Sequence, residues 1–362
     1  MATIAIDARF YGTENTGLGR YTANVLAHLP GHLPRHTLRI LLRKKYFDSL
    51  TFPSNVEKIL ADYPPYSIAE QLTLPSLLAS LSSSLLYTFH FNVPLFTDLP
   101  TVVTIHDLIK TYSTGRDTTT RAPWLYALKR HGYEIVMHKA ATGSCAVIVP
   151  TNTVKNDLLA RYPQIPPERI HPIPEAPDEI FRANLGFENL RLELPHKYLL
   201  FVGNAYPHKN LPVLLDALSA LPEYSLVMVA KSTPYLEKCL SALSASARAR
   251  IHLFSGLDDR ELVSIHLRAA MLVTPSLMEG YGLVGLEALM VGTPVIASNI
   301  PVYREVYGDR VTYFDPQSSK DLISAIKSVG AHHRMRPTVS KRTWGHVAHD
   351  IAGVINEACV RL

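Results

Sequence analysis

The sequence predicts an α/β protein of two domains, each built on a doubly wound sheet of parallel strands. The chain has 362 residues, enough for two domains of about 100–200 residues. Short apolar runs alternate with longer segments of helical periodicity, and such alternation is typical of βαβ units. A proline-rich stretch over residues 163–184 lies between two series of these units, and we interpret it as a strand-bearing linker.

The first half is predicted to begin with strand, loop and helix. Its apolar runs predict strands at Thr3–Asp7, Val102–Ile105 and Ala146–Val149. A loop with three glycines is expected after the first strand, and then a helix with apolar residues at helical spacing from Leu18 to Leu29. Thr151 or Asn152 is expected to cap a helix that continues to Arg161.

The second half repeats this alternation more clearly. Strands are predicted at Tyr198–Gly203, Ser225–Ala230, Ile251–Phe254, Met271–Thr274, Pro294–Ala297 and Val311–Phe314. The helix predicted over Asp258–Ala269 begins with a capping box formed by Asp258 and Glu261, although the DD pair is also open to interpretation as a metal-binding motif. A last helical pattern covers Trp344–Ala358. We therefore assign residues 1–178, with the helix 344–362, to an N-terminal domain and residues 179–343 to a C-terminal domain.

Composition excludes several classes of protein. Hydrophobic residues make up 47% and charged residues 19%, which excludes intrinsic disorder. No apolar run approaches the roughly 18–20 residues that span a bilayer, and the N-terminus does not resemble a secretory signal. Three widely spaced cysteines argue against a disulfide framework or a zinc site and favour a reducing cytosol. The net charge of +5 suits phosphorylated ligands or an anionic membrane surface, and by itself it does not indicate a nucleic acid partner.

The most informative segment is 275–298, PSLMEGYGLVGLEALMVGTPVIAS. It begins where a predicted strand ends, and its glycines precede a predicted helix. Backbone N–H groups at such a helix start converge on one point, and the helix dipole adds partial positive charge, so the segment predicts a phosphate site. Glu279 lies just before this site and Glu287 lies in the helix. A carboxylate on either side suits the vicinal hydroxyls of a sugar and of a ribose.

Glu279 and Glu287 stand in an E-x7-E pattern, and the sequence around them resembles the retaining glycosyltransferases of family 4, in the GT-B superfamily. This resemblance implies two Rossmann-like domains that face a cleft, with a C-terminal helix crossing back to the N-terminal domain. It implies that Glu279 holds the hydroxyls of the donor sugar and that Glu287 holds the ribose. The backbone amides implied to contact the pyrophosphate and sugar are those of Gly280, Tyr281, Gly282 and Leu283. Val284 departs from the proline of many relatives, and we expect it to be a packing position.

A second segment, FVGNAYPHKNLPVLLD, places Lys209 at a predicted helix start. A cation there opposes the helix dipole at a cost of about 0.3–1 kcal/mol, which a bound anion would offset. Family 4 members often carry an arginine and a lysine in this loop, both on the pyrophosphate. Lys209 matches the lysine, whereas Asn204 stands in place of the arginine, and His208 is a candidate to replace the missing charge.

Three further places carry weaker signals. Gly17 and Gly19, in NTGLGR, resemble the family's N-terminal loop facing the donor phosphates. A full G-x-G-x-x-G is absent from this segment, which disfavours a dinucleotide-dependent oxidoreductase. His106, in TIHDL at a predicted strand end, is similar to the family's T-x-H-D pattern, which implies a contact with the donor sugar near the reacting carbon. Leu257 lies where the backbone of relatives contacts the nucleobase.

The function implied by the resemblance is hexosyl transfer from a nucleotide-diphospho-sugar, with His106, Lys209 and Glu279 as the catalytic residues. The implied chemistry is front-face, retaining and independent of metal ions or other cofactors. Mannose from GDP-mannose is the favoured donor, and the acceptor is expected to be a glycan or a lipid-linked sugar in the synthesis of cell-surface polysaccharide or glycolipid. A sugar-nucleotide epimerase of the same fold and a non-catalytic nucleotide-sugar-binding protein are the alternatives.

The expected location is the cytoplasm. Basic residues over 39–45 and between 110 and 139, with aromatic residues near Trp124, raise the hypothesis of a peripheral contact with the inner face of the membrane. A solvated basic face with an aromatic side chain packed inward is the alternative. No nucleic acid partner is expected.

Overall fold

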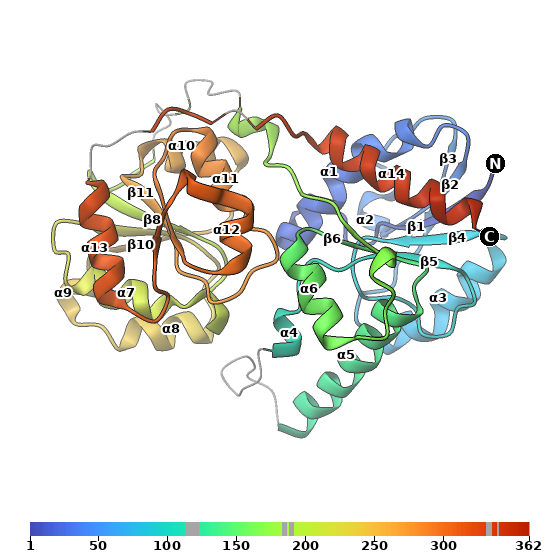
Figure 1. The fold of residues 1–362 in the computed structure, drawn as a ribbon, viewed down its shortest axis with the longest axis horizontal. Helices are drawn as coiled ribbons and strands as arrows, with labels where there is room; N and C mark the ends of the chain where they lie inside the picture. The colour runs from blue at the N-terminus through green and yellow to red at the C-terminus, as the bar shows by residue number, and fades with distance from the viewer. Residues whose placement is uncertain (113–122, 183–186, 188–191, 331–334, 339, 362) are drawn as a thin grey trace. The chain divides into compact units, whose positions relative to one another are not determined.

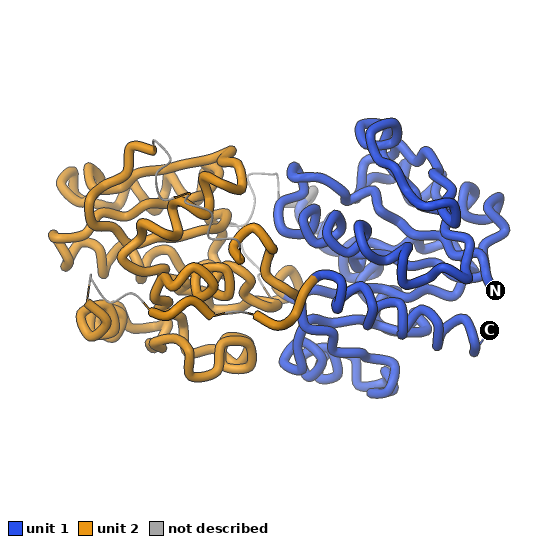
Figure 2. The backbone as a smooth tube through the Cα atoms, turned by 90° about the horizontal axis from the view of Figure 1, so that it is seen from above, with its two compact units in different colours: residues 1–108, 124–175, 344–362 blue, residues 109–123, 176–343 orange. Residues whose placement is uncertain are grey.

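The computed structural model describes residues 1–112, 123–182, 187, 192–330, 335–338 and 340–361 (Figure 1). The chain divides into two compact units (Figure 2). Unit 1 comprises Met1–Leu108, Trp124–Glu175 and Trp344–Leu362, and unit 2 comprises Ile109–Pro123 and Ala176–Thr343. The change from unit 1 to unit 2 falls at residue 175 rather than at the expected 178, and residues 109–123 count with unit 2.

Unit 1 is built on a seven-stranded parallel sheet in the order β3-β2-β1-β4-β5-β6-β7. The strands are β1 (Thr3–Asp7), β2 (Thr37–Leu42), β3 (Val56–Leu60), β4 (Leu85–Thr88), β5 (Thr101–Thr104), β6 (Ala146–Val149) and β7 (Ile170–Pro172). The helices are α1 (Thr16–His32), α2 (Lys44–Phe47), α3 (Ile68–Ser80), α5 (Pro123–Gly143), α6 (Asn152–Arg161) and α14 (Trp344–Val360). Figure 1 shows α14 lying along α1, and the Tyr21 and Trp344 rings meet edge-on with 5.6 Å between centroids.

Local sequence signals located β1, β6 and α6 correctly. The Thr151 hydroxyl accepts a hydrogen bond from the Val154 N–H at 3.1 Å, which confirms Thr151 as the cap of α6. Three strands were not predicted, namely β2, β3 and β4. The first part of the basic run 39–45 belongs to β2, and the Arg39 guanidinium pairs with Glu57 on β3 at 2.8 Å. Strand pairing therefore accounts for part of this run.

The expected glycine loop is shorter than predicted, because α1 already begins at Thr16. Gly17 and Gly19 consequently lie in the first turn of a helix rather than in a loop. A Cβ atom on Gly19 would lie 1.8 Å from the carbonyl oxygen of Gly12, so glycine permits the close approach of the two backbones here. No such contact constrains Gly17, since a Cβ atom there would have no other atom within 4 Å.

Unit 2 is built on a six-stranded parallel sheet in the order β10-β9-β8-β11-β12-β13. The strands are β8 (Tyr198–Val202), β9 (Ser225–Val229), β10 (Ile251–Phe254), β11 (Met271–Thr274), β12 (Val295–Ser298) and β13 (Thr312–Phe314). The helices are α4 (Ile109–Tyr112), α7 (Leu211–Ser219), α8 (Pro234–Ser241), α9 (Ala245–Arg248), α10 (Asp259–Arg268), α11 (Leu283–Met290), α12 (Pro301–Tyr307) and α13 (Ser319–Val329).

The predicted capping box at the start of α10 is confirmed. Asp258 accepts from the Glu261 N–H and Glu261 accepts from the Asp258 N–H, both at 2.8 Å. These two orphan donors are therefore satisfied within the helix start, and the aspartate pair needs no metal ion to explain it.

Alternate residues of β8 divide the core of unit 2 into two layers. Leu199 and Phe201 pack in a cluster with apolar residues of α7, whereas Tyr198 and Leu200 pack in another cluster with α11 and α12. Burial on both faces is what a parallel sheet requires. It places α11 and α12 together on one side of the strands that lead into the candidate site.

Candidate active site

The candidate site in unit 2 lies at the carboxyl ends of two neighbouring strands, β8 and β11. Because these strands are adjacent and parallel, the loops that follow them lie side by side. The Leu277 N–H donates to the carbonyl oxygen of His208 at 2.8 Å and joins the two loops directly. Lys209, on the first loop, and Glu279, on the second, are brought together in this way.

The Glu279 carboxylate is held by three donors on a single oxygen. Oε1 accepts from the Lys209 ammonium at 2.6 Å, from the Ser276 hydroxyl at 2.7 Å and from the Tyr303 hydroxyl at 3.2 Å. Burial opposes the charged form of Glu279, but the charge and hydrogen bonds of Lys209 and Ser276 outweigh it and hold the pKa below its usual value. Glu279 is therefore a carboxylate acceptor near neutral pH.

Lys209 ends a short 3-10 turn, Pro207–Lys209, directly before α7. The next residue, Asn210, has φ +53° in the left-handed region, and its amide donates to the Pro316 carbonyl at 2.7 Å. This turn directs the Lys209 side chain toward Glu279 rather than along α7. The Lys209 side chain is 22% exposed, so it is not closed off from solvent or a ligand.

The rest of this loop supplies no second cation. Burial, helped by the charge of Lys209, lowers the pKa of His208 to about 4, so its ring is neutral near pH 7. His208 instead stacks on Tyr206 with 5.9 Å between ring centroids. The Asn204 side chain accepts from the Lys231 N–H at 3.4 Å. The lowered pKa of His208 therefore argues against its candidate role as a replacement charge at neutral pH.

The glycine-containing segment reaches α11 through Gly282, which has φ +100°. Glu287 lies in the second turn of α11 and is 5% exposed. Val284 packs against the core cluster of α11 and α12, as predicted, and Leu257 and Tyr281 contact the same cluster. The predicted backbone contacts, Gly280 to Leu283, are all partly exposed.

In unit 1, His106 follows β5 and uses both ring nitrogens. Nδ1 lies 3.1 Å from Glu175 Oε1, and Nε2 lies 3.0 Å from the carbonyl oxygen of Phe89. Both partners are acceptors, so the doubly protonated ring suits them best. Burial opposes this charge, but the hydrogen bond and charge of Glu175 raise the pKa of His106 above its ordinary value.

Sequence reasoning missed Glu175, although a signal was present. It is a carboxylate two residues beyond the apolar Ile173 in a proline-rich stretch, and it is only 7% exposed. Like His106, it follows a strand at the carboxyl edge of the sheet, because β7 ends at Pro172. A charged residue at such an edge is a candidate partner for any neighbouring strand end.

A second buried network in unit 1 was also missed. The Arg9 guanidinium pairs with Asp7 at 2.6 Å and with Glu70 at 2.5 Å. Asn92 donates to both Glu70 oxygens, at 2.8 and 2.9 Å. The network ties the segments after β1 and β4 to α3.

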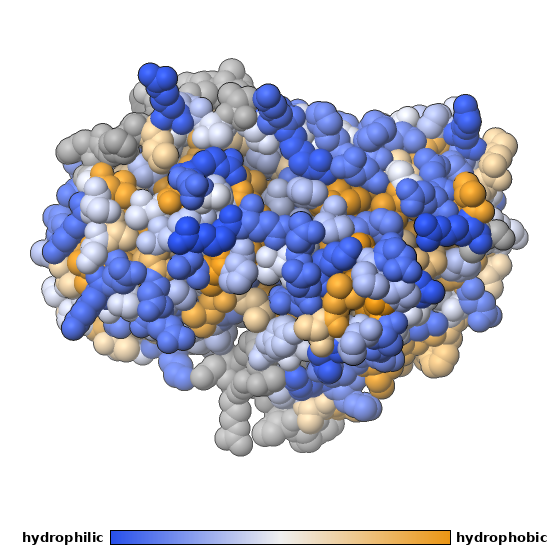
Figure 3. Space-filling view, in the orientation of Figure 1, coloured by the Kyte–Doolittle hydropathy of each residue, from blue (hydrophilic) through white to orange (hydrophobic). Residues whose placement is uncertain are grey.

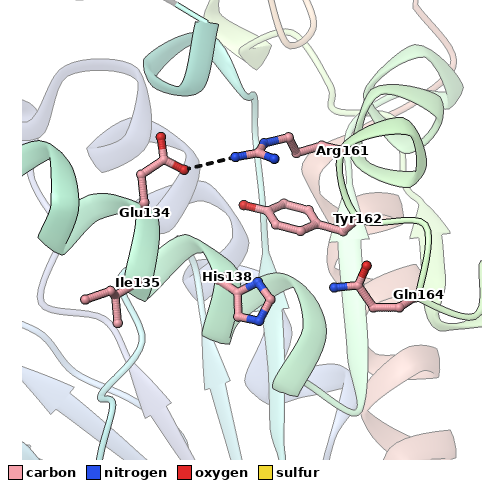
Figure 4. A pocket seen from close by; sticks show the side chains of 6 residues that line it. All are labelled: Glu134, Ile135, His138, Arg161, Tyr162 and Gln164. Atoms are coloured by element: carbon pink, nitrogen blue, oxygen red, sulfur yellow. Dashed lines mark hydrogen bonds and ion pairs between the residues drawn. The ribbon is translucent and has the colours of Figure 1, made fainter.

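Unit 1 also contains a surface pocket of about 450 Å³ between α5 and the end of α6 (Figure 4). Its lining residues are Glu134, Ile135, His138, Arg161, Tyr162 and Gln164. An ion pair between Arg161 and Glu134 spans it at 3.4 Å. None of the residues predicted to bind the donor lines this pocket.

In the part of the chain that the structure describes, no group of three or more His, Cys, Asp or Glu is arranged to hold a metal ion. No described helix is both long and apolar enough to cross a bilayer. On the face in Figure 3, apolar side chains are scattered among hydrophilic ones. The basic and aromatic stretch near Trp124 falls largely outside the described residues and side chains.

The sequence matches two family models that together cover most of the chain. Residues 16–179 match Glycosyltransferase Family 4, and residues 186–342 match Glycosyl transferases group 1.

Two relatives and one solved structure illustrate the similarity, at 18–29% sequence identity. The O-antigen chain mannosyltransferase RfbU of Salmonella typhimurium is 24% identical over 268 residues, covering 73% of this chain and 70% of that protein. The alpha-maltose-1-phosphate synthase of Mycolicibacterium smegmatis is 29% identical over 266 residues, covering 62% and 67%. The structure of sucrose-phosphate synthase from Thermosynechococcus elongatus is similar with a TM-score of 0.68 at 18% identity, covering 100% and 97%. The chain belongs to the family 4 glycosyltransferases and is a hexosyltransferase with the GT-B fold.

Proposed function

We propose that this enzyme transfers a hexosyl group from a nucleotide-diphospho-sugar to a glycan or lipid-linked acceptor, with retention of configuration. The observation that carries the proposal is the Lys209–Glu279 pair, 2.6 Å apart, beside the glycine-containing start of α11. A carboxylate that stays charged can accept two sugar hydroxyls, and the cation with the adjacent amides can hold a pyrophosphate.

The proposed reaction exchanges one bond at the anomeric carbon for another on the same face. The bond from this carbon to the pyrophosphate oxygen breaks, and the carbon becomes oxocarbenium-like. Lys209 and the amides of residues 280–283 stabilise the negative charge that develops on the leaving group. The acceptor oxygen then bonds to the anomeric carbon, and its proton passes to the departing phosphate. Each step uses only the chain, the donor and the acceptor.

Lys209 can serve this reaction without leaving Glu279. An ammonium has three N–H donors, and the contact with Glu279 uses one of them. The remaining donors are available to pyrophosphate oxygens. Glu287 is proposed to accept from the ribose hydroxyls, and its burial in the second turn of α11 would remove competing water.

His106 is proposed to contact the donor sugar near its reacting carbon. Because both ring nitrogens already have acceptors, this contact requires one hydrogen bond to be exchanged. The bond to the Phe89 carbonyl is the one we expect to exchange, since the Glu175 bond is supported by charge.

Mannose from GDP-mannose is the proposed donor, because one relative is named as a mannosyltransferase. The other is named for a maltose phosphate product, so glucose nucleotides belong in the same test. We suggest a glycan or lipid-linked acceptor from the O-antigen chain in the first relative's name.

A nucleotide-sugar panel tests the proposal. Purified protein is incubated with GDP-mannose, UDP-glucose and ADP-glucose, with and without polyprenyl-linked saccharides, and the products are separated by mass spectrometry. We expect a hexose-extended acceptor and free nucleoside diphosphate with one donor, an α-anomeric product by NMR, and equal rates in the presence of EDTA. An epimerised nucleotide sugar formed without acceptor would support the epimerase alternative instead. No product and no nucleotide binding would refute the proposal.

A further inference from the structure

Two tyrosines on α12 pack against residues 274–282, the segment that leads from β11 into α11 and that we call the donor segment. Tyr303 and Tyr307 are four residues apart, so they share one face of the helix. Their side chains are 1% and 0% exposed, and the rings stack with 4.9 Å between centroids. A buried tyrosine hydroxyl needs a hydrogen-bond partner, and both of these hydroxyls find theirs on the segment 274–282.

The Tyr303 hydroxyl links the Thr274 hydroxyl to the Glu279 carboxylate through two hydrogen bonds. It donates to Glu279 Oε1 at 3.2 Å and is itself bonded to the Thr274 hydroxyl at the end of β11. Since the tyrosine proton goes to Glu279, Thr274 acts as the donor in the other bond. Burial and the nearby Glu279 charge raise the pKa of Tyr303 well above its ordinary value, so the hydroxyl keeps its proton.

The Tyr307 hydroxyl holds the backbone at the start of α11. It donates to the Gly282 carbonyl at 2.6 Å. A Cβ atom on Gly282 or on Gly285 would lie 2.4 Å from this hydroxyl. Both glycines therefore make room for the Tyr307 ring, in addition to any room they leave for a ligand. Burial and the charge of Glu279 raise the pKa of Tyr307 well above its ordinary value, so this hydroxyl also keeps its proton.

We propose that Tyr303 and Tyr307, the tyrosine pair, are positioning residues of the donor site. Tyr303 fixes the Glu279 carboxylate, and Tyr307 fixes the backbone amides that precede α11. Lys209, Ser276 and Tyr303 all donate to Oε1 of Glu279. Within the part of the chain that the structure describes, Oε2 accepts no hydrogen bond, so Oε2 is the oxygen that receives the sugar hydroxyls. The inference rests on the proposed function, since it assigns how that donor site is held.

The two hydroxyls therefore predict two separable effects. Tyr303→Phe keeps the packed ring and removes the hydroxyl that bonds both Glu279 and Thr274, so Glu279 loses one of its three donors and the sugar part of the donor should lose affinity. Tyr307→Phe removes the bond to Gly282, so the diphosphate part should lose affinity. Tyr313→Phe is the matched control: the Tyr313 hydroxyl also bonds α12, at the Tyr303 carbonyl, but it does not contact the donor segment.

The experiment measures binding of the nucleoside diphosphate and of the nucleotide sugar to each variant by calorimetry, with steady-state kcat and KM beside it. For Tyr303→Phe we expect unchanged affinity for GDP or UDP, a three- to tenfold loss for the nucleotide sugar, and a raised KM. For Tyr307→Phe we expect both ligands to lose the same three- to tenfold. Tyr313→Phe should bind both like the wild type.

A double-mutant cycle separates positioning from folding. If Tyr303 acts through Glu279, Tyr303→Phe should change nucleotide-sugar affinity less than twofold in a Glu279→Gln background. The inference is overturned if the loss persists in that background, if Tyr313→Phe produces the same loss, or if Tyr303→Phe affects both ligands equally. A wild-type protein that binds nucleoside diphosphates and nucleotide sugars while both phenylalanine variants match it overturns this inference alone. A wild-type protein that binds neither ligand overturns the proposed function as well.

Discussion

The two units place ion pairs at equivalent positions, the carboxyl ends of parallel strands, but they expose them differently. In unit 1, the side chains of Arg9 and Glu70 are both 0% exposed, and Asp7 and Asn92 are their further hydrogen-bond partners. In unit 2, Lys209 is 22% exposed and Glu279 is 14% exposed. A fully buried network gives a ligand little access, whereas a partly exposed pair with an unused carboxylate oxygen can contact one. The comparison supports a fold-stabilising role for the first network and the proposed catalytic role for the second.

Removing Arg9 is the strongest test of whether the buried network of unit 1 stabilises the fold. In Arg9→Met the buried carboxylates of Asp7 and Glu70 lose their cation, and we expect a loss of about 3–5 kcal/mol in the free energy of unfolding. Trp124 and Trp344 both belong to unit 1, so tryptophan fluorescence during urea unfolding reports this unit.

The control for Arg9 is a surface pair of the same unit. Arg39 and Glu57 are 24% and 53% exposed, and Arg39→Met should cost less than about 1 kcal/mol. Equal losses in the two variants would show that burial does not distinguish these pairs.

Arg9→Met is expected to lower stability strongly. Lys209→Met should instead lower activity strongly and stability only slightly. We expect a fall in kcat of about 10²–10³-fold, because a preorganised donor to the leaving group is lost. The free energy of unfolding should change by only about 1 kcal/mol, since the pair is partly exposed. Lys231→Met is the control, because the exposed Lys231 contacts the same loop only through its backbone N–H. An unchanged kcat in Lys209→Met would remove the lysine from the mechanism.

Glu287→Gln tests whether Glu287 binds the ribose while other residues of the proposed donor site bind the pyrophosphate. We expect about tenfold weaker binding of GDP or UDP, because the amide replaces the charged acceptor of the ribose hydroxyls. Inorganic pyrophosphate should bind as before, since it carries no ribose. Calorimetry with the three ligands checks this, and Glu261→Gln at the α10 cap is the matched control. Normal nucleotide affinity with reduced thermal stability would assign Glu287 to the core instead.

Local signals made part of this molecule predictable. The capping box at Asp258, the cap at Thr151 and the strand–glycine–helix run around Glu279 each lie within a few adjacent residues, and each was placed from sequence. By contrast, β2 was not predicted, because its apolar residues overlap a basic run. The two doubly wound domains could be predicted because alternation is also a local pattern, repeated along the chain, whereas the GT-B fold was implied by the family resemblance of the segment around Glu279.

Partners far apart along the chain could not be predicted. Glu175 is 69 residues from His106, and Tyr303 is 24 residues from Glu279. These pairs depend on strand order and on which face of the sheet a helix covers, and no single segment encodes either. The close contact of Gly19 with the backbone of Gly12 was also not predicted from the sequence.

The smallest expected effect concerns pH and the His106–Glu175 pair. In Glu175→Gln the amide oxygen still accepts from Nδ1 but carries no charge, so we expect a loss of about 1 kcal/mol. The folded-state pKa of His106 lies above the ordinary 6.5, so the stabilisation is complete below pH 6.5 and is lost as pH rises through the folded value. The difference between wild type and variant should therefore be largest at pH 5.5–6.5 and should shrink toward alkaline pH.

Urea unfolding followed by tryptophan fluorescence across this pH range tests the assignment, because His106 and Glu175 also belong to unit 1. In a His106→Gln background the same Glu175→Gln change should show no such pH dependence, since the titrating ring is gone. If the dependence persists there, another group faces Glu175 and carries the charge. If the pH dependence vanishes, the charge that acts on Glu175 is that of His106. The His106–Glu175 and Lys209–Glu279 pairs are then both charged, and they differ in how many of their hydrogen-bonding groups already have partners within the chain.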